Sequence, residues 1–593
     1  MKPVDDQAPV DTATPRVLVL TADERLWPEG EAVLFLGEWC KLYSRRSVWQ
    51  AMDAATVRHP WLDFSRFSQD YAYLRGLYGR LLPALAESLN NLHSTQHKDR
   101  YWQILVGPWL ATFLHIAFER WTVLSTAFKQ WNVISVASGY AAPLDHVPRN
   151  MNDFHHLAAG DAWNGFLLNA ILQFRGELRP TSSRRLEPEI RSTEVPLPSW
   201  TSNVINGLLA LLARTLVRRN DHFMISTYVP LERLSLVQLR LGQFPARWAS
   251  VAPTVLSPNP QHRQWRVKFA AQDTFQNFVV SILHLQLPTV FCEGYAALMS
   301  QVRRRSWPTE PQSIFTSNSL WADEVVMGYT AAKQGQGSRL IYGQHGGLYG
   351  VGAFSWAEEH ETAIADQYLT WGWTGLSPGK YRPVGYFKRK LKRQVGRGLV
   401  GKLVMVCYDY PRYTHRLDSE AVVMLGGYVE NCLEFGRHLS SKVREDLLIR
   451  LTQRDSGWSQ AERWHDAFPS VPVDMGVKKM DELAASSRLM VYTYNSTGFL
   501  EAFASNVPCI MFWDAAVSRV RAEAAHEFNE LKRVGILHDS PQSAAAHVDA
   551  IWDAVPTWWD SRDVQVVLQK FKKVYCKLSP TIGQEIQEAL RSV

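Results

Sequence analysis

The stretch SRLMVYTYNSTGFLEAFASNVPCIMFWD, Ser487 to Asp514, decides the fold of this 593-residue chain. The apolar run LMVYTY predicts a buried strand, NSTG a turn, FLEAFAS a short amphipathic helix and CIMFWD a second strand. Strands that alternate with short helices predict a parallel, doubly wound α/β sheet. A helix that opens beside the carboxyl end of a strand favours an anion, because its free N–H groups and dipole attract phosphate.

The turn at the start of this helix supplies candidate nucleotide-binding residues. Asn495 and Gly498 flank Ser496 and Thr497, whose hydroxyls can act as donors to a phosphate. Glu501, one turn into the helix, could accept hydrogen bonds from ribose hydroxyls. The alternative is an ordinary strand–turn–helix unit in which the cap only stabilises the helix.

The same alternation extends toward the N-terminus. Helical periodicity dominates the first third of the chain, and the Pro/Arg/Ser-rich residues 178–200 predict a long loop. Ile104 to Phe118 is apolar but contains a proline and a histidine, so it predicts a buried helix. Strands are predicted at 32–40, 313–318, 339–344, 365–373, 401–410 and 446–455.

Composition is ordinary for a globular protein, with 46% apolar residues, 20% charged residues and a net charge of +7. The polar N-terminus lacks the apolar core of a signal peptide, so we expect a cytoplasmic protein. Six scattered cysteines without CxxC spacing predict reduced core residues and no structural zinc. The 23 tryptophans could line a carbohydrate-sized cleft or fill large cores.

A glycine-rich segment, RLIYGQHGGLYGVG from Arg339 to Gly352, follows one predicted strand. Its glycines permit close backbone approach and leave amide N–H groups free as donors. We expect His345 to act as an acid or base, with Gln344, Gly346 and Gly347 contacting the substrate. A turn without catalytic function is the alternative.

Downstream, the run AEEHETAIAD offers further acids. We expect Glu361, as a catalytic group, or His360, as a substrate contact, to point into the cleft, and Glu358 to be solvated. For the catalytic acid or nucleophile we predict Asp323, which follows the end of a predicted strand. Asp145 is the alternative, with a substrate-binding role.

Near the N-terminus, the segment FLGEWC closes the predicted early strand. Glu38 could receive an acceptor hydroxyl and Trp39 could stack on a sugar ring, since ligands bind at the carboxyl ends of strands in open α/β sheets. Strand-to-helix packing explains the same residues equally well.

Several blocks of the sequence carry a family resemblance: LFLGEWC, SNSLWADEV, YGQHGGLYG, ADQYLTWGW and YNSTGFLEAF. They resemble a family of transferases encoded in bacterial O-antigen and surface-carbohydrate clusters, which is similar to Kdo transferases with a GT-B-like fold. The resemblance implies an α/β protein with two Rossmann-like domains that face a central cleft, the N-terminal half being helix-rich. It also implies transfer of Kdo, or a related ulosonic acid, from a CMP-sugar to a glycan or lipid-linked acceptor in lipopolysaccharide, O-antigen or capsule biosynthesis.

The resemblance and the changes in residue pattern along the sequence together suggest that the chain is divided into five segments. They are a disordered tail (1–16), an acceptor-side Rossmann-like domain with helical insertions (17–386), a basic linker (387–402), a nucleotide-sugar-binding Rossmann-like domain (403–560) and a helical tail (561–593). The linker carries seven basic residues and no acid, so it could contact the anionic inner membrane or form a solvated face. Its basic residues are not interleaved with aromatics, which disfavours nucleic acid as a partner.

CMP-sugars leave a single nucleotide phosphate, which a helix N-terminus can hold without a metal. No DxD pair suits a metal–diphosphate site, so we expect no metal ligands, metal-independent activity and no permanently bound cofactor. Two alternatives remain: a GT-B transferase that uses a UDP- or GDP-sugar, and a non-catalytic scaffold that binds glycan or nucleotide.

Overall fold

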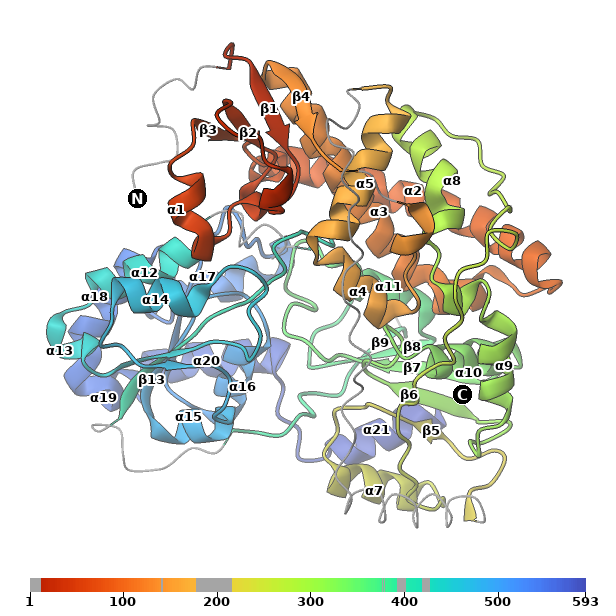
Figure 1. Ribbon diagram of the computed structural model, residues 1–593. Coiled ribbons are helices and arrows are strands. Elements are labelled where there is room, and N and C mark those ends of the chain that lie inside the picture. The colour runs from red at the N-terminus through yellow and green to blue at the C-terminus, as the bar shows by residue number, and fades with distance from the viewer. Residues whose placement is uncertain are drawn as a thin grey trace.

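The computed structural model describes residues 12–139, 142–177, 216–375, 377, 379–391, 401–418 and 427–592. The described chain contains three parallel β-sheets, which we call the N-terminal, middle and C-terminal sheets, with helices packed against them (Figure 1). The middle and C-terminal sheets belong to two halves of the molecule (Figure 1). The predicted α/β class with parallel sheets is therefore confirmed.

The C-terminal sheet has the strand order β12-β11-β10-β13-β14-β15. Counted along the chain this is the 3-2-1-4-5-6 order of the Rossmann fold, so the order reverses between β10 and β13. The strand–helix–strand unit predicted from residues 487–514 is confirmed as β13, α16 (Thr497–Ser505) and β14. The strands are β10 (Lys402–Val406), β11 (Leu447–Arg450), β12 (Val473–Asp474), β13 (Ser487–Tyr492), β14 (Cys509–Phe512) and β15 (Leu537–His538).

The C-terminal sheet is covered on both faces, as a parallel sheet must be. Leu403 and Met405 of β10 face one core with α12 and α18, whereas Val404 and Val406 face a second core with α16 and α20. The helices of this half are α12 (Tyr428–His438), α13 (Ser441–Arg444), α14 (Gln460–Ala467), α15 (Met480–Ser486), α17 (Ala525–Arg533), α18 (Pro541–Ile551), α19 (Val555–Trp559) and α20 (Arg562–Tyr575).

The middle sheet runs in sequential order, β5-β6-β7-β8-β9, with every neighbouring pair parallel. Its strands are β5 (Phe223–Met224), β6 (Ser313–Thr316), β7 (Arg339–Gly343), β8 (Gln367–Thr370) and β9 (Tyr381–Pro383). Its helices are α7 (Leu231–Arg240), α8 (Thr274–Gln286), α9 (Tyr295–Arg303), α10 (Glu324–Gly335) and α11 (Trp356–Ile364).

A small N-terminal sheet lies where the sequence predicted a single early strand. Its order is β3-β2-β1-β4, built from β1 (Arg16–Val19), β2 (Val33–Phe35), β3 (Ala54–Thr56) and β4 (Val133–Ala137). The strands were hard to predict because each is only three to five residues long. The helices of this region are α1 (Arg46–Trp49), α2 (Phe64–His93), α3 (Asp99–Gln130), α4 (Met151–Ala158) and α5 (Asp161–Phe174).

Helix α3 lies at the centre of the N-terminal part of the molecule. Its stretch from Ile104 to Phe118 is buried throughout, as predicted, and helices α2, α5, α8, α10 and α11 pack against it. It tolerates Pro108 in its interior. The helix thus connects the N-terminal sheet with the middle sheet.

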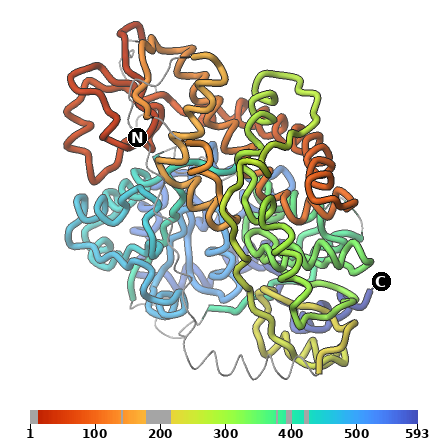
Figure 2. The backbone as a smooth tube through the Cα atoms, turned by 45° about the vertical axis from the view of Figure 1, so that its right-hand side comes forward, coloured from red at the N-terminus to blue at the C-terminus, as the bar shows by residue number. Residues whose placement is uncertain are grey.

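The C-terminal segment crosses between the halves. Helix α20 packs on α16 and α17, whereas α21 (Ile582–Arg591) lies beside α7 under the middle sheet (Figures 1 and 2). The Arg591 guanidinium donates to the Arg240 carbonyl at 2.7 Å. Three predicted features lie partly or wholly outside the described residues: the tail at 1–11, the loop at 178–200 and linker residues 392–400.

The tryptophans and cysteines are mainly core residues. Trp102, Trp109 and Trp163 are fully buried, which favours the core interpretation of the tryptophans. All six cysteines are buried and none forms a disulfide, as the sequence predicted.

Candidate functional site

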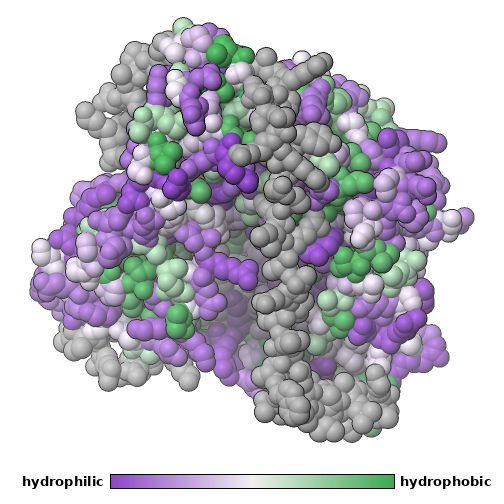
Figure 3. All heavy atoms as spheres, in the orientation of Figure 1, coloured by the Kyte–Doolittle hydropathy of each residue, from purple (hydrophilic) through white to green (hydrophobic). Residues whose placement is uncertain are grey.

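The site lies between the carboxyl edges of the middle and C-terminal sheets. In the space-filling view, a recess with mainly hydrophilic residues around it separates the two halves (Figure 3). The loop after β7 meets the start of α16 here, and the Gly347 N–H donates to Thr497 Oγ1 at 3.0 Å. A Cβ atom at Gly347 would lie 2.4 Å from the Ser496 carbonyl oxygen, so this approach requires glycine.

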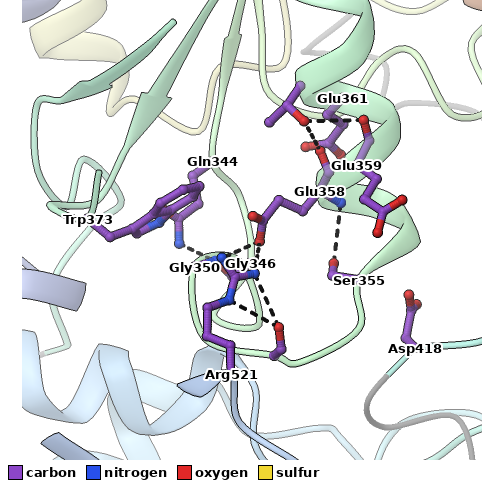
Figure 4. A network of polar contacts seen from close by, with 12 residues as sticks. Gln344, Gly346, Gly350, Ser355, Glu358, Glu359, Glu361, Trp373, Asp418 and Arg521 are labelled. Carbon is purple, nitrogen blue, oxygen red and sulfur yellow. Dashed lines mark hydrogen bonds and ion pairs between the residues drawn. The ribbon is translucent and has the colours of Figure 1, made fainter. Parts of the chain in front are cut away.

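The side-chain amide of Gln344 holds the loop in place by hydrogen bonds. Its Oε1 accepts from the backbone N–H of Trp371 and from Trp373 Nε1, both at 2.8 Å, and its Nε2 donates to the Gly346 carbonyl at 2.8 Å (Figure 4). The side chain is fully buried and its amide is engaged within the protein. The structure therefore gives Gln344 a positioning role rather than the predicted substrate contact.

His345 is the partly exposed residue that follows Gln344 in this loop, with 20% of its side chain exposed. The Tyr349 hydroxyl lies 3.2 Å from His345 Nε2 and donates to Glu361 Oε1 at 2.8 Å. Glu361 itself is fully buried and also accepts from Trp321 Nε1 at 2.8 Å and from the Tyr368 hydroxyl at 3.0 Å. Glu361 therefore orients the Tyr349 hydroxyl, which in turn contacts the His345 ring.

The pKa values in this group shift in opposite directions. Burial lowers the pKa of His345 to about 3, helped by the charges of Arg416 and Lys388, so the imidazole is neutral at physiological pH. Burial raises the pKa of Glu361 to about 8 despite its three hydrogen-bond donors. Such opposed shifts in two neighbouring groups are typical of a functional site.

The next residues on α11 have different surroundings. His360 is buried against Trp321 and Trp356, with no hydrogen-bond partner among the described residues and a pKa lowered by burial to about 3. Of the two alternatives at positions 360 and 361, it is Glu361 that faces His345.

The expectation that Glu358 is solvated is wrong. It is buried, its Oε2 accepts from the Gly350 N–H at 2.7 Å, and it pairs with Arg521 at 2.8 Å (Figure 4). Because Arg521 follows β14, this ion pair joins the two halves of the molecule beside the site. The sequence could not show it, since the partners are 163 positions apart.

The start of α16 has the features of an anion site. Ser496 is the N-cap residue, but its side chain makes no capping hydrogen bond. Asn495 is fully buried, and neither its amide oxygen nor its amide nitrogen has a partner in the described structure. A buried amide without partners is costly unless a ligand or water satisfies it. A Cβ atom at Gly498 would lie 2.6 Å from the Tyr492 ring, so this glycine keeps the turn compact.

Glu501 has a partner within the protein. Its Oε1 accepts from Lys388 Nζ at 2.6 Å, and Lys388 lies 5.6 Å from the centre of the Tyr228 ring. Tyr228 in turn stacks on His345 with 6.0 Å between ring centres. The predicted contact of Glu501 with a ribose would have to compete with Lys388.

The predicted carboxylates elsewhere lie in structural positions. Asp323 caps α10, its Oδ1 accepting from the Val326 N–H at 3.2 Å, and burial raises its pKa. Asp145 lies partly buried in a 3-10 helix, Pro143–His146.

Glu38 is exposed and pairs with Lys41 at 2.9 Å. The Trp39 ring is fully buried and donates to the Leu20 carbonyl at 3.0 Å, so packing explains it.

Sequence reasoning missed the cationic residues of the site. Arg416, in the segment after β10, and Lys388 both act electrostatically on His345. Arg416 pairs with Asp418 at 3.0 Å, and Asp418 accepts from the Trp356 N–H at 2.8 Å. The signal for Arg416 was its position, since β10 precedes the reversal of strand order where ligands bind in such sheets. Lys388 lies in the basic segment 387–402, which the sequence suggested as a membrane contact or a solvated face.

The described residues contain no group of three His, Cys, Asp or Glu side chains arranged as metal ligands. Metal-independent activity stays a prediction. Within the same part of the chain, no helix combines the length and apolarity needed to cross a membrane.

Fold and site together define a doubly wound α/β protein in which a histidine-containing loop of the middle sheet contacts the start of α16 in the C-terminal half. The chain belongs to the LIC12162 family of transferases, whose model matches residues 16–590. No protein of curated function matches the sequence.

Three solved structures show distant similarity. The wall teichoic acid polymerase TagF is 9% identical over 66% of this chain and 94% of that chain, with a TM-score of 0.31. MurG of Acinetobacter baumannii is 10% identical over 63% and 100%, with a TM-score of 0.30. WaaG, a glycosyltransferase involved in lipopolysaccharide biosynthesis, is 10% identical over 51% and 96%, with a TM-score of 0.26.

Proposed function

We propose that the protein is a glycosyltransferase of bacterial surface-polysaccharide biosynthesis, which moves Kdo or a related ulosonic acid from a CMP-sugar to a glycan or lipid-linked acceptor. The observation that carries the proposal is the contact between the His345 loop and the start of α16, through Gly347 and Thr497. The contact supports the proposal because glycosyl transfer needs donors that stabilise the departing phosphate and a base for the acceptor hydroxyl, and the α16 start and His345 are the candidates for these two roles.

The proposed donor phosphate lies at the start of α16. Asn495 offers an unused amide there and Ser496 an uncommitted hydroxyl. A CMP-ulosonic acid carries one phosphate and one carboxylate. Arg416 and Lys388, whose charges act on His345, are the cations proposed to contact these groups, in competition with their partners Asp418 and Glu501.

His345 is the proposed base for the acceptor hydroxyl. In the absence of a ligand, burial and two cations hold its pKa at about 3, where it accepts a proton poorly. An anionic donor beside Arg416 and Lys388 would offset their charges and raise the pKa of His345. The proton acceptor would therefore become stronger only when the donor is bound.

Binding of CMP, UDP and GDP, measured by isothermal titration calorimetry, tests the donor. We expect CMP to bind most tightly and Ser496→Ala to weaken it. Preference for UDP or GDP would refute the CMP assignment but leave the transferase proposal standing.

Transfer is tested by mass spectrometry after incubation with CMP-Kdo and candidate acceptors. We expect His345→Ala to abolish transfer while CMP still binds, and EDTA to leave transfer intact. If His345→Ala transferred sugar normally, the catalytic role of the loop would be refuted, and complete loss in EDTA would refute metal independence.

A further inference from the structure

A further pocket lies between two segments that each lead from one half of the molecule to the other. They are residues 386–390, which follow the middle sheet, and residues 578–580, which follow α20. The Tyr386 N–H donates to the Lys577 carbonyl at 2.8 Å, which joins the two segments. Between them and the start of α7 opens a pocket of about 510 Å³. Its lining includes residues from three parts of the chain that are distant in sequence.

The pocket carries an excess of positive charge. Arg233, Lys388, Arg389 and Lys390 line it, and Glu232 is the one acid among its lining residues. Lys388 is paired with Glu501, whereas the other three cations have no ion-pair partner in the described structure.

A further basic residue, Lys572, lies near the pocket and adds to its excess of positive charge. The pKa of Lys572 is lowered by its burial and by the positive charge of Lys390. Like charges held close together favour a bound anion, because the anion relieves their repulsion.

Two neutral groups also fit an anion. Tyr386 is only 3% exposed, and its hydroxyl has no hydrogen-bond partner in the described structure. Helix α7 begins at the pocket, after Pro230, without a side-chain cap on its first N–H groups. An unsatisfied buried hydroxyl and an uncapped helix start are donors that a phosphate can accept from.

We infer that this pocket binds a phosphate group, through the side chains of Arg233, Arg389 and Lys390 together with the Tyr386 hydroxyl. Two arginine forks suit the tetrahedral oxygens of a phosphate better than a single carboxylate or halide. The phosphate could belong to a free phosphorylated molecule or to the headgroup of an anionic lipid. Lys388 belongs both to the pocket lining and to the candidate site, but none of these four side chains is used in the proposed function, so the inference does not rest on it.

The test uses the full chain and a matched pair of triple variants. The pocket variant is Arg233→Gln/Arg389→Gln/Lys390→Gln, and all three side chains are exposed, so folding should be retained. The control is Arg304→Gln/Arg562→Gln/Lys129→Gln, which removes the same charge from exposed residues elsewhere. Both variants keep the start of α16, so any phosphate bound there is common to them.

Two probes distinguish the sources of the phosphate. Inorganic phosphate is titrated by calorimetry, and vesicles of phosphatidylglycerol are compared with vesicles of phosphatidylcholine by co-sedimentation. We expect binding at least about tenfold weaker in the pocket variant than in the control. Tyr386→Phe, which removes one hydroxyl, should weaken binding several-fold without changing charge.

Loss of phosphate binding in the pocket variant would support a free phosphorylated ligand. Loss confined to phosphatidylglycerol vesicles would support a lipid headgroup. Equal binding by the pocket variant and the control, or no binding of either probe by the wild-type protein, would overturn the inference. CMP binding by the pocket variant reports separately on the site at α16.

Discussion

The contact between the His345 loop and α16 can be tested by Gly347→Ala. The new Cβ atom would lie 2.4 Å from the Ser496 carbonyl oxygen and 2.8 Å from the Thr497 nitrogen, and both are backbone atoms. Ordinary contact distances require the loop and the helix to separate by about 1 Å. The hydrogen bond from the Gly347 N–H to Thr497, now 3.0 Å, would lengthen to about 4 Å and be lost.

The expected cost combines two effects. Overpacking costs about 1–3 kcal/mol and the lost hydrogen bond about 0.5–1.5 kcal/mol, so the free energy of unfolding should fall by about 2–4 kcal/mol. Urea denaturation measures this change, and calorimetry with CMP reports whether the start of α16 has moved. We expect weaker nucleotide binding and slower transfer as well, because the loop carries His345.

Gly335→Ala is the matched control. Gly335 ends α10, and a Cβ atom there would meet nothing within 4 Å. Alanine at this position should be neutral or stabilise the protein by up to about 1 kcal/mol. Should Gly347→Ala prove as stable and active as Gly335→Ala, the loop cannot touch α16 as described, and the reasoning that joins the two would fail.

Three further predictions follow from the same site. If donor charge raises the pKa of His345, the acid limb of kcat, measured with saturating donor, should lie at higher pH than that of kcat/KM; coincident limbs would contradict this. Because the pKa of Glu361 is raised from 4.5 to about 8, the protonated form is favoured by folding, so its stabilising contribution is complete below pH 4.5 and lost as pH rises through 8. Glu361→Gln should therefore flatten the loss of stability between pH 6.5 and 8 in urea titrations, and an unchanged slope would count against the shift. Arg521→Gln should cost about 1–2 kcal/mol by leaving Glu358 without its cation, and the double variant with Glu358→Gln should recover part of that loss; no recovery would mean that the pair adds little.

The fold was largely predictable where the sequence has local periodicity. Residues 487–514 combine two apolar runs with a short amphipathic helix between them, and each element forms within a residue or two of its expected place. The N-terminal sheet was not predictable, because strands such as Val33–Phe35 are too short to carry a pattern of alternation. Its strands depend on parallel pairing with distant partners, as when β1 pairs with β4 more than a hundred residues away.

In the candidate site, too, contacts between residues distant in sequence could not be predicted. His345 and the start of α16 could be singled out because each follows a predicted strand, and the structure brings them together. The functions of their neighbours depend on partners that no local pattern reveals. Gln344 looks like a ligand contact until Trp371 and Trp373 are seen to use its oxygen, and Asp323 looks catalytic until it is seen to cap α10.

Residues of the N-terminal part hold the segment that carries Arg416 in place. Arg416 lies in the segment 407–418, which leaves the C-terminal sheet after β10 and is held by residues of the N-terminal part. Arg412 donates to the Trp39 carbonyl and pairs with Asp161 at 2.7 Å, and the Leu417 N–H donates to His115 Nδ1 at 3.2 Å.

Further along the same segment, the Thr414 carbonyl accepts from the buried Arg120 guanidinium of α3 at 3.0 Å. Bonds on both sides of Arg416 are therefore made to the N-terminal part, while its charge acts on His345 of the middle sheet. A segment anchored in this way can hold a cation near the imidazole without support from its own sheet. The N-terminal part therefore positions the segment that carries Arg416, although it supplies no catalytic side chain in the proposal.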